Sequence, residues 1–308
     1  MRDRACQSWV SLAERKDSFV FLTGDLGFRA LEPLRAALGD RFINAGVAEQ
    51  NMVSVAAGLA TQRLDAWVYS IAPFCYARPY EQIRNDVCQH GLPVKLVGNG
   101  GGYGYGAMGA THHALEDYGS LVVLPGMRAV VPAFGDDVEP AIAQLAAQAG
   151  PGYLRLGRCE APPSWTPPPF SAWRRLLAGA RGVVVAVGPL VGPLVAALLE
   201  RPEAERPAVW LLGVLPIEPA QIPADLLDTI ERSGALLVAE EHVSTGSAGE
   251  AIARSLLERG VHVACFEHVC ARGYPSGRYG SQAWHRRECG LDAVSLIERS
   301  AKLWSEVG

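Results

Sequence analysis

The 308-residue sequence lacks any run of about 18 apolar residues long enough to cross a membrane, and its first residues lack the apolar stretch of a secretion signal. It also lacks an excess of basic residues, because 28 Lys and Arg stand against 32 Asp and Glu, a net charge of -4 with no basic stripe or polybasic cluster. These absences argue against nucleic-acid and membrane partners. We therefore expect a cytoplasmic protein whose partners are other proteins and small molecules.

The cysteines form no recognisable motif. Seven of them, an odd number, are spread along the chain without a Cys-x-x-Cys pair. This pattern predicts reduced, mostly buried thiols rather than disulfides or a zinc site, with Cys75 the one nearest a candidate site. No Gly-Lys-Ser/Thr follows a glycine-rich segment either, so the sequence has no phosphate-loop signature.

Short apolar strands alternate with helical segments along the whole chain, which predicts an α/β fold. Residues 1–160 form a first alternating block and residues 181–308 a second, and five prolines fall between positions 161 and 170. Because so many prolines exclude a regular element, we interpret residues 161–180 as a stiff linker. The sequence thus predicts two doubly wound domains, each with a mostly parallel sheet and its own core.

One acidic residue has an unusual position, in the segment from 41 to 60. The pattern there predicts a strand ending at Asn44, a tight turn and a helix from Val47 onward. Apolar residues of this helix recur at steps of three and four, and Glu49 extends their stripe, one turn into the helix. Burial disfavours a charged carboxylate whereas a helix N-terminus favours it, a combination typical of a functional acid. A glutamate that merely caps the helix is the alternative.

Further candidates follow other predicted strands, since functional loops in parallel sheets come after strand C-termini. Asp25 follows the strand at 19–22 and either caps the next turn or points into a site. Residues 99–117 are dense in glycine, which lets the backbone pass close to a ligand. His112 and His113 end this segment, and a hydrogen-bonding or proton-transfer role fits them better than a metal site, because adjacent histidines project in different directions.

Glu240, Glu241 and His242 lie at the C-terminal end of a strand in the second block. Two interpretations are open for them. They are either functional residues or a salt-bridged cluster at a domain interface, and the second is the more common outcome for such a group.

Six motifs, in order along the chain, resemble the C-terminal half of transketolases, the thiamine-diphosphate enzymes that transfer two-carbon ketol units. They are LTGDLG (22–27), FINAGVAEQNM (42–52), RPYEQIRN (78–85), GATHHALED (109–117), PGMRAVVP (125–132) and VAEEH (238–242). The resemblance implies a pyrimidine-binding domain in residues 1–160 and a transketolase C-terminal domain in residues 181–308.

The other half of a transketolase is missing from the sequence. In the family, a Gly-Asp-Gly motif followed by asparagines holds the diphosphate and its Mg²⁺, and the sequence contains no such motif. The chain therefore resembles the small subunit of a split transketolase, with no metal ligands of its own. A large N-terminal subunit would supply the diphosphate and Mg²⁺ site, in an α2β2 heterotetramer with active sites between chains.

The resemblance also implies roles for cofactor-binding residues. Glu49 matches the glutamate that hydrogen-bonds N1′ of the aminopyrimidine and so helps to activate the cofactor. Phe74 matches an aromatic residue that packs on this ring, and Ile71 stands where the family has a second aromatic. Asp25 lies in the matching loop at the domain interface.

Substrate-binding residues are implied in the same way. His112 matches a histidine that faces the substrate oxygens, and Arg158 matches a cation that binds the substrate phosphate, a role suited to a guanidinium. Asn99, which opens the glycine-rich segment, belongs to the same candidate set. Two positions depart from the family. Gly100 replaces a phosphate-binding histidine, and Met108 replaces an aspartate that, in the family, hydrogen-bonds a sugar hydroxyl.

These departures predict a changed acceptor. Loss of a charged donor and a charged acceptor leaves a polyhydroxylated sugar phosphate with unpaired polar groups, at about 1–3 kcal/mol each. We expect cofactor activation to be retained and the acceptor to be a less hydroxylated, non-phosphorylated or carrier-bound aldehyde.

Other activities share this fold and glutamate. The alternatives are the β subunit of a 2-oxoacid dehydrogenase, a deoxyxylulose-phosphate-synthase-like carboligase, and a degenerate, non-catalytic subunit. The segments at 78–85 and 110–113 resemble the matching segments of transketolases more closely than those of a 2-oxoacid dehydrogenase or a deoxyxylulose-phosphate-synthase-like carboligase. Retention of Glu49 and Phe74 argues against the third, because a scaffold needs neither a buried acid nor a ring-packing partner.

Overall fold

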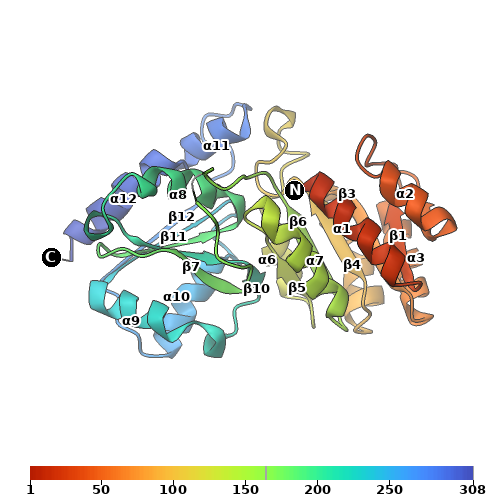
Figure 1. Ribbon diagram of the computed structural model, residues 1–308, viewed down its shortest axis with the longest axis horizontal. Coiled ribbons are helices and arrows are strands. Elements are labelled where there is room, and N and C mark those ends of the chain that lie inside the picture. The colour runs from red at the N-terminus through yellow and green to blue at the C-terminus, as the bar shows by residue number, and fades with distance from the viewer. Residues whose placement is uncertain (164, 308) are drawn as a thin grey trace.

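The computed structural model describes residues 1–163 and 165–307. Two β-sheets, of seven and five strands, lie along the long axis of the molecule, and each is built mainly from one half of the chain (Figure 1). The expected linker residue Ser164 and the C-terminal Gly308 lie outside the described residues.

The first sheet has the strand order β10-β5-β6-β4-β3-β1-β2, and all its strands are parallel except β10. Its strands are β1 (Phe19–Thr23), β2 (Phe42–Asn44), β3 (Asp65–Ile71), β4 (Lys95–Asn99), β5 (Arg128–Val130), β6 (Gly152–Leu156) and β10 (Val214–Leu215). Strands β1, β3, β4 and β6 are buried along almost their whole length, as central parallel strands should be.

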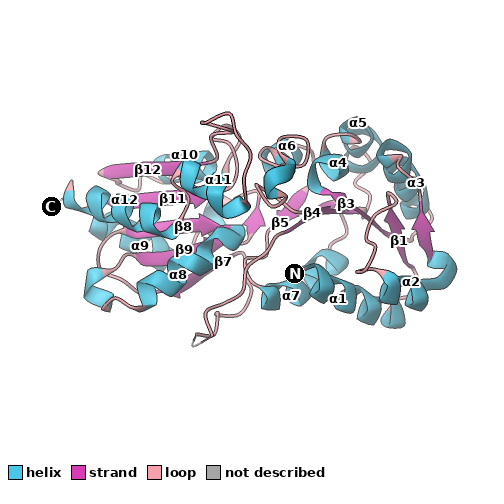
Figure 2. Ribbon diagram, turned by 90° about the horizontal axis from the view of Figure 1, so that it is seen from above, coloured by secondary structure: helices cyan, strands magenta, loops and turns pink. Residues whose placement is uncertain are grey.

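Helices cover both faces of this sheet, with α1, α2 and α7 on one face and α3 to α6 on the other (Figure 2). They are α1 (Arg2–Arg15), α2 (Glu32–Leu38), α3 (Glu49–Thr61), α4 (Ala72–Tyr76), α5 (Tyr80–Gln82), which continues into a π-helical turn (Ile83–Cys88), α6 (Asp117–Val122) and α7 (Val138–Ala147). The α1 face packs through aromatic side chains, and Trp9 contacts both Phe21 and Trp67.

The second sheet has the order β12-β11-β8-β9-β7 and is parallel except for β7 at its edge. Its strands are β7 (Trp173–Leu177), β8 (Val183–Val187), β9 (Ala208–Leu212), β11 (Ala235–Glu240) and β12 (Cys265–Cys270). Its helices are α8 (Val191–Leu199), α9 (Ala224–Ser233), α10 (Ala248–Glu258), α11 (Gln282–Cys289) and α12 (Ala293–Ser305). Alternate residues of β8 face α9 and α10 on one side and α8 and α12 on the other, so this sheet is also doubly wound.

The predicted α/β fold with two mostly parallel sheets is confirmed. The elements that were not predicted include α1, α6, β7, β10 and α11. Strand β7 lies inside the segment at 161–180 that we interpreted as a linker, where it pairs antiparallel with β9 after the last proline. Strand β10 has only two residues and depends on its pairing with β5 in the other half. Both are edge strands that long-range pairing creates, which local pattern does not reveal.

Two predicted boundaries were displaced. Helix α3 begins at Glu49 rather than Val47. The apolar pattern of residues 261–266 predicts a strand there, and the strand is observed at Cys265–Cys270. Register explains the second shift, because Ala235 at the start of β11 pairs with Cys265 rather than with an earlier residue.

A buried ion pair connects the glycine-rich segment to both halves of the chain. Arg155 Nε donates to Asp117 Oδ2 at 2.7 Å, and the two side chains are almost completely buried. Arg155 Nη2 also donates to the backbone carbonyls of Ala114 (3.0 Å) and Glu241 (2.9 Å). Because an unpaired ion at this depth costs several kcal/mol, these contacts favour one fixed arrangement of the two halves.

Glu240, Glu241 and His242 form a buried polar cluster between the halves. Glu240 accepts hydrogen bonds from the Tyr118 hydroxyl and from the backbone at the start of α10. Glu241 accepts two hydrogen bonds from Arg286, at 3.0 and 2.8 Å, and the His242 ring stacks on Tyr118 at 4.2 Å. Of the two interpretations left open for this group, the interface cluster is the one observed.

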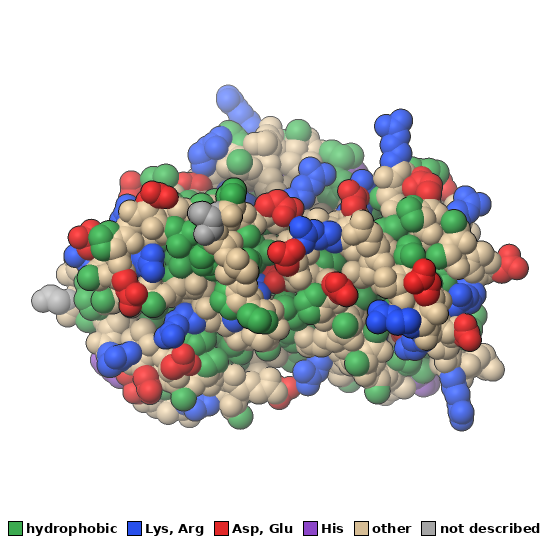
Figure 3. All heavy atoms as spheres, in the orientation of Figure 1, with side chains coloured by type: hydrophobic (Ala, Val, Ile, Leu, Met, Phe, Trp, Pro, Cys, Tyr) green, Lys and Arg blue, Asp and Glu red, His purple; other side chains and the backbone are tan. Residues whose placement is uncertain are grey.

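The surface carries mixed charge. On the face shown in Figure 3, acidic and basic side chains are interspersed, with no extended area of one sign. Within the described residues, none of the helices combines the length and apolar character that a membrane crossing requires.

His113 fastens the glycine-rich segment to the second half. Its Nε2 donates to the Gly106 carbonyl at 2.8 Å, so Nδ1 accepts a hydrogen bond from the Tyr274 hydroxyl, also at 2.8 Å. The ring packs between aromatic neighbours that include Tyr103 and His285. Burial is the main cause that lowers the pKa of His113 from 6.5 to about 4.

This geometry predicts acid destabilisation. Between pH 6.5 and about 4 the unfolded chain binds a proton at His113 that the folded chain does not, so the free energy of unfolding falls as the pH is lowered. The loss should approach about 3 kcal/mol at the acid end of this range. Denaturant unfolding at a series of pH values should give a shallower acid dependence for His113→Gln than for the wild type. Parallel curves would contradict the assignment.

Candidate active site

The candidate residues follow strands that end side by side. In the parallel pairing of β1, β2, β3, β4 and β6, Thr23 lies opposite Asn44, Ile71 opposite Asn99, and Asn99 opposite Leu156. The loops that follow these strands therefore meet at the carboxyl edge of the sheet, where ligands bind in open α/β folds.

Glu49 is the first residue of α3 and is only 5% exposed. The turn before it depends on Gly46, which has a φ of +71° and donates its backbone N–H to Asn44 Oδ1 at 3.0 Å. Glu49 Oε1 accepts a hydrogen bond from Arg78 Nη1 at 2.9 Å. The carboxylate thus lies on the buried face, as expected, but at the helix start, where the helix dipole favours its charge most.

Arg78 belongs to the site although no role was predicted for it. Its guanidinium carbon lies 4.0 Å from the centroid of the Phe74 ring, so the same group stacks on Phe74 and donates to Glu49. It lies in the turn after α4, four residues after Phe74, and its place at the start of the RPYEQIRN motif was the available signal.

Rings connect this pair to the glycine-rich segment. The Phe74 and His112 ring centroids are 5.3 Å apart, and those of His112 and Tyr105 are 5.8 Å apart. Thr111 Oγ1 is 2.9 Å from Nδ1 of His112, which leaves Nε2 of that ring for another partner. A continuous set of contacts therefore runs from Glu49 through Arg78, Phe74 and His112 to Tyr105.

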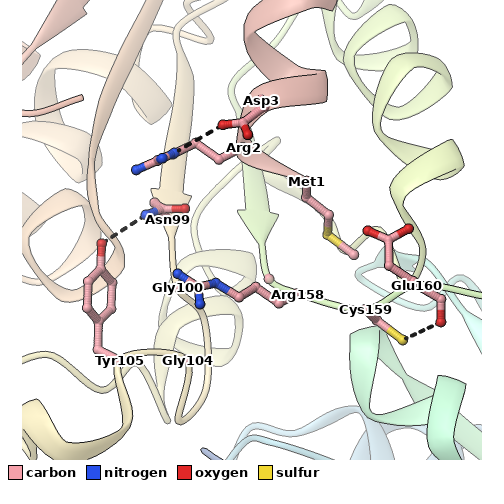
Figure 4. Close-up of a pocket in the computed structure, with 11 residues that line it drawn as sticks. Met1, Arg2, Asp3, Asn99, Gly100, Gly104, Tyr105, Arg158, Cys159 and Glu160 are labelled. Atoms are coloured by element: carbon pink, nitrogen blue, oxygen red, sulfur yellow. Dashed lines mark hydrogen bonds and ion pairs between the residues drawn. The ribbon is translucent and has the colours of Figure 1, made fainter. Parts of the chain in front are cut away.

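Beyond Tyr105 lies a cavity of about 560 Å³ (Figure 4). Its walls include Asn99 and Arg158 from the predicted substrate set, together with Gly100, which departs from the family, and Arg2 at the start of α1. Asn99 Nδ2 donates to the Tyr105 hydroxyl at 2.8 Å. Sequence reasoning did not single out Tyr105, because a tyrosine among glycines gives no indication of where its ring packs.

Three predicted residues lie outside this set of contacts. Asp25, with a φ of +58°, is held by Asn44 Nδ2 at 2.9 Å and lines a separate, smaller hollow. Ile71 is half-buried at the end of β3. Met108 is 56% exposed in a short turn and does not line the cavity.

The arrangement of Glu49 and Phe74 suits a flat group that carries N–H donors. The Arg78 guanidinium is such a group, and it makes a stacking contact and a hydrogen bond at once. Cys75, fully buried next to Phe74, is not a candidate nucleophile, because burial raises its pKa to about 12. Within the described residues, no group of three or more His, Cys, Asp or Glu is arranged to hold a metal.

The fold and the candidate site together define an α/β protein of two mostly parallel sheets, with its candidate site at the carboxyl edge of the first sheet. The family described as "Transketolase, pyrimidine binding domain" matches residues 4–163. The chain is 31% identical to an apulose-4-phosphate transketolase subunit of Phocaeicola vulgatus, over 82% of each chain. The corresponding subunit of Actinobacillus succinogenes is 29% identical, over 89% of this chain and 88% of the relative. The chain belongs to the transketolase family.

Other comparisons distinguish split from single-chain relatives. The structure of a split-gene transketolase, an inactive β4 tetramer, has a TM-score of 0.82 and 28% identity, and it covers 99% of this chain and 98% of that one. A 1-deoxy-D-xylulose-5-phosphate synthase of Thermomicrobium roseum is 32% identical over 96% of this chain but only 47% of its own length. The chain thus spans almost all of the split relatives and about half of the single-chain one.

Removal of the arginine should destabilise the protein. Arg78→Ala leaves the Glu49 carboxylate buried and unpaired, which we expect to lower the free energy of unfolding by about 1–3 kcal/mol, a range that allows for the partial exposure of Arg78. Denaturant unfolding measures this change. In the Glu49→Gln background the same substitution should cost much less, and equal costs in the two backgrounds would show that the pair is not coupled.

Proposed function

We propose that the chain is the small subunit of a split, thiamine-diphosphate-dependent transketolase that transfers a two-carbon ketol unit from a ketose phosphate donor to an aldehyde acceptor. The observation that carries the proposal is the buried Glu49 carboxylate at the carboxyl edge, joined through Arg78 to the half-buried Phe74 ring. End-to-end similarity to the two apulose-4-phosphate transketolase subunits supports it.

The chain would contribute the pyrimidine half of the cofactor site. Thiamine diphosphate, when bound, supplies the carbon nucleophile that attacks the donor carbonyl. Glu49 would hold a proton at N1′ of the aminopyrimidine, a task suited to a carboxyl group shielded from water. Phe74 would pack on the ring, and Arg78 would have to give up at least one of its two contacts to admit it.

A partner chain would complete the site. The charged diphosphate needs Mg²⁺ and oxygen ligands, and no such cluster lies within the described residues. The similar split-gene chain was observed as an inactive β4 tetramer, which supports a requirement for a large subunit. We propose an α2β2 heterotetramer in the cytoplasm with the active sites at the contacts between large and small subunits.

The acceptor would enter through the cavity beside Tyr105. Arg2 and Arg158 line that cavity together with Asp3 and Glu160. Asp3 pairs with Arg2 and Glu160 with Arg4, whereas Arg158 forms no ion pair with a described residue, so an anionic end would be favoured at Arg158. His112 would face the reacting oxygens, close to Phe74. Of the acceptors that the sequence leaves open, these cations favour a sparingly hydroxylated anionic aldehyde over a neutral one, and an anionic carrier-bound aldehyde also fits.

A deoxyxylulose-phosphate-synthase-like carboligase is the second candidate. The 32% identity to such a synthase over nearly the whole chain favours it. The two activities differ in their donor, because a carboligase of this type consumes pyruvate rather than a ketose. Assay of the reconstituted complex with each donor therefore separates them.

Replacement of the carboxyl group is the direct test of catalysis. Glu49→Gln keeps the size of the side chain but cannot exchange its proton, so activity of the complex should fall by about 10²–10⁴. Size-exclusion chromatography should show unchanged assembly with the large subunit. Glu81→Gln, at an exposed position in the neighbouring helix, is the matched control and should keep full activity. Full activity in Glu49→Gln would overturn the proposal.

Calorimetry tests the need for a partner. The isolated chain should bind thiamine diphosphate at least about 100-fold more weakly than the reconstituted complex in Mg²⁺, because most of the binding free energy comes from the diphosphate. Tight binding by this chain alone would contradict the split-site proposal.

A further inference from the structure

The Tyr105 ring covers the backbone of Gly100 at the wall of the cavity. A Cβ atom added at Gly100 would lie 2.3 Å from Cε2 and 2.4 Å from Cδ2 of Tyr105, which is closer than atoms can approach. Gly100 also has a φ of +78°, a conformation that favours glycine. No side chain from position 100 can therefore reach the cavity while Tyr105 keeps its place, and the phenol fills the space that such a side chain would need.

Asn99 determines whether the Tyr105 hydroxyl acts as a hydrogen-bond donor or acceptor toward a ligand. The phenol oxygen accepts the hydrogen bond from Asn99 Nδ2, so its own proton is available to an acceptor elsewhere (Figure 4). Within the described residues, the hydroxyl donates to no other group. Burial raises the pKa of Tyr105, so the group is a neutral donor at physiological pH.

The location of the hydroxyl suits recognition of a bound ligand. On one side, the Tyr105 ring contacts His112, which in turn contacts Phe74 of the proposed cofactor site. On the other side, the cavity is lined by Arg158, which forms no ion pair with any described residue. Tyr105 therefore contacts His112 through its ring and shares the wall of the cavity with Arg158, so it lies between the proposed cofactor site and that cation.

We propose that Tyr105 is a specificity-determining residue for the acceptor, and this inference rests on the proposed function. Its O–H donates to an uncharged oxygen, a hydroxyl or a carbonyl, of a short anionic aldehyde whose anionic end lies near Arg158. A neutral phenol adds one hydrogen bond without adding charge. A charged side chain at position 100 would contact the anionic group of the acceptor. The Tyr105 phenol instead contacts the middle of the acceptor.

Tyr105→Phe tests the hydroxyl alone, because the phenylalanine ring still covers Gly100. Two acceptor probes are compared in the reconstituted complex: D-glyceraldehyde 3-phosphate, which is long enough to reach the cavity, and glycolaldehyde, which is not. We expect kcat/KM for D-glyceraldehyde 3-phosphate to fall about 10-fold, mainly through KM, and kcat/KM for glycolaldehyde to stay within about twofold. Thiamine diphosphate affinity, measured by calorimetry, should not change.

A second measurement tests the packing without activity. Gly100→Ala should lower the denaturant midpoint of the wild type more than that of Tyr105→Ala, because the collision with the ring is absent in the second background. The strain of alanine at a positive φ is common to both backgrounds and cancels in the comparison. Equal shifts would show that Tyr105 does not exclude side chains from position 100.

The outcomes are distinct for the two proposals. Absence of thiamine-dependent ketol transfer by the wild-type complex with either probe would defeat the proposed function. If the wild type is active and Tyr105→Phe has the same kcat/KM for D-glyceraldehyde 3-phosphate, the role of Tyr105 is overturned. Equal losses with both probes would also overturn it, since they would indicate a general structural effect. Transfer to glycolaldehyde alone would overturn the anionic class of acceptor.

Discussion

The buried Arg155 guanidinium is the contact on which the arrangement of the site depends. It pairs with Asp117 at one end of the glycine-rich segment and donates to the Glu241 carbonyl of the second half. The segment passes so close that a Cβ at Gly101 would lie 2.4 Å from Arg155 Nε. Because the cation cannot lose its partners at this depth without a large cost, the segment is held at both ends, and Tyr105 and His112 between them keep their positions.

A second buried charge determines what the cofactor end of the site can do. Glu49 is placed by the helix start and the turn before it, and its carboxylate is neutralised by Arg78 rather than by water. A ring that took the place of the guanidinium would have to offer a similar donor to the same oxygen and a similar flat surface to Phe74. Under the proposed function, this requirement limits which rings can occupy the site, and it follows from the burial of the carboxylate.

Local patterns in the sequence predicted the parallel strands and the loops after them, and so placed Glu49, Phe74, His112 and Asn99 at one edge. They could not predict β10 or β7, which exist because of pairing with strands distant in sequence. For the same reason the placement of Arg78 and Tyr105 was missed, since each is defined by the side chain it contacts across the site. Met108 is 56% exposed, and its expected part in substrate binding stays a prediction.

The two ends of the site differ in how freely they can change. Glu49 and its support are part of the first core, where substitution removes packing or leaves an unpaired charge. The cavity is lined by glycines and by exposed or half-buried side chains such as Tyr105 and Arg158, whose replacement costs the fold little. Under the proposed function, recognition of the acceptor can therefore diverge while the proposed cofactor end stays constant. Gly100 and Tyr105 illustrate this point, because the packing of one aromatic ring on one glycine shapes the cavity wall.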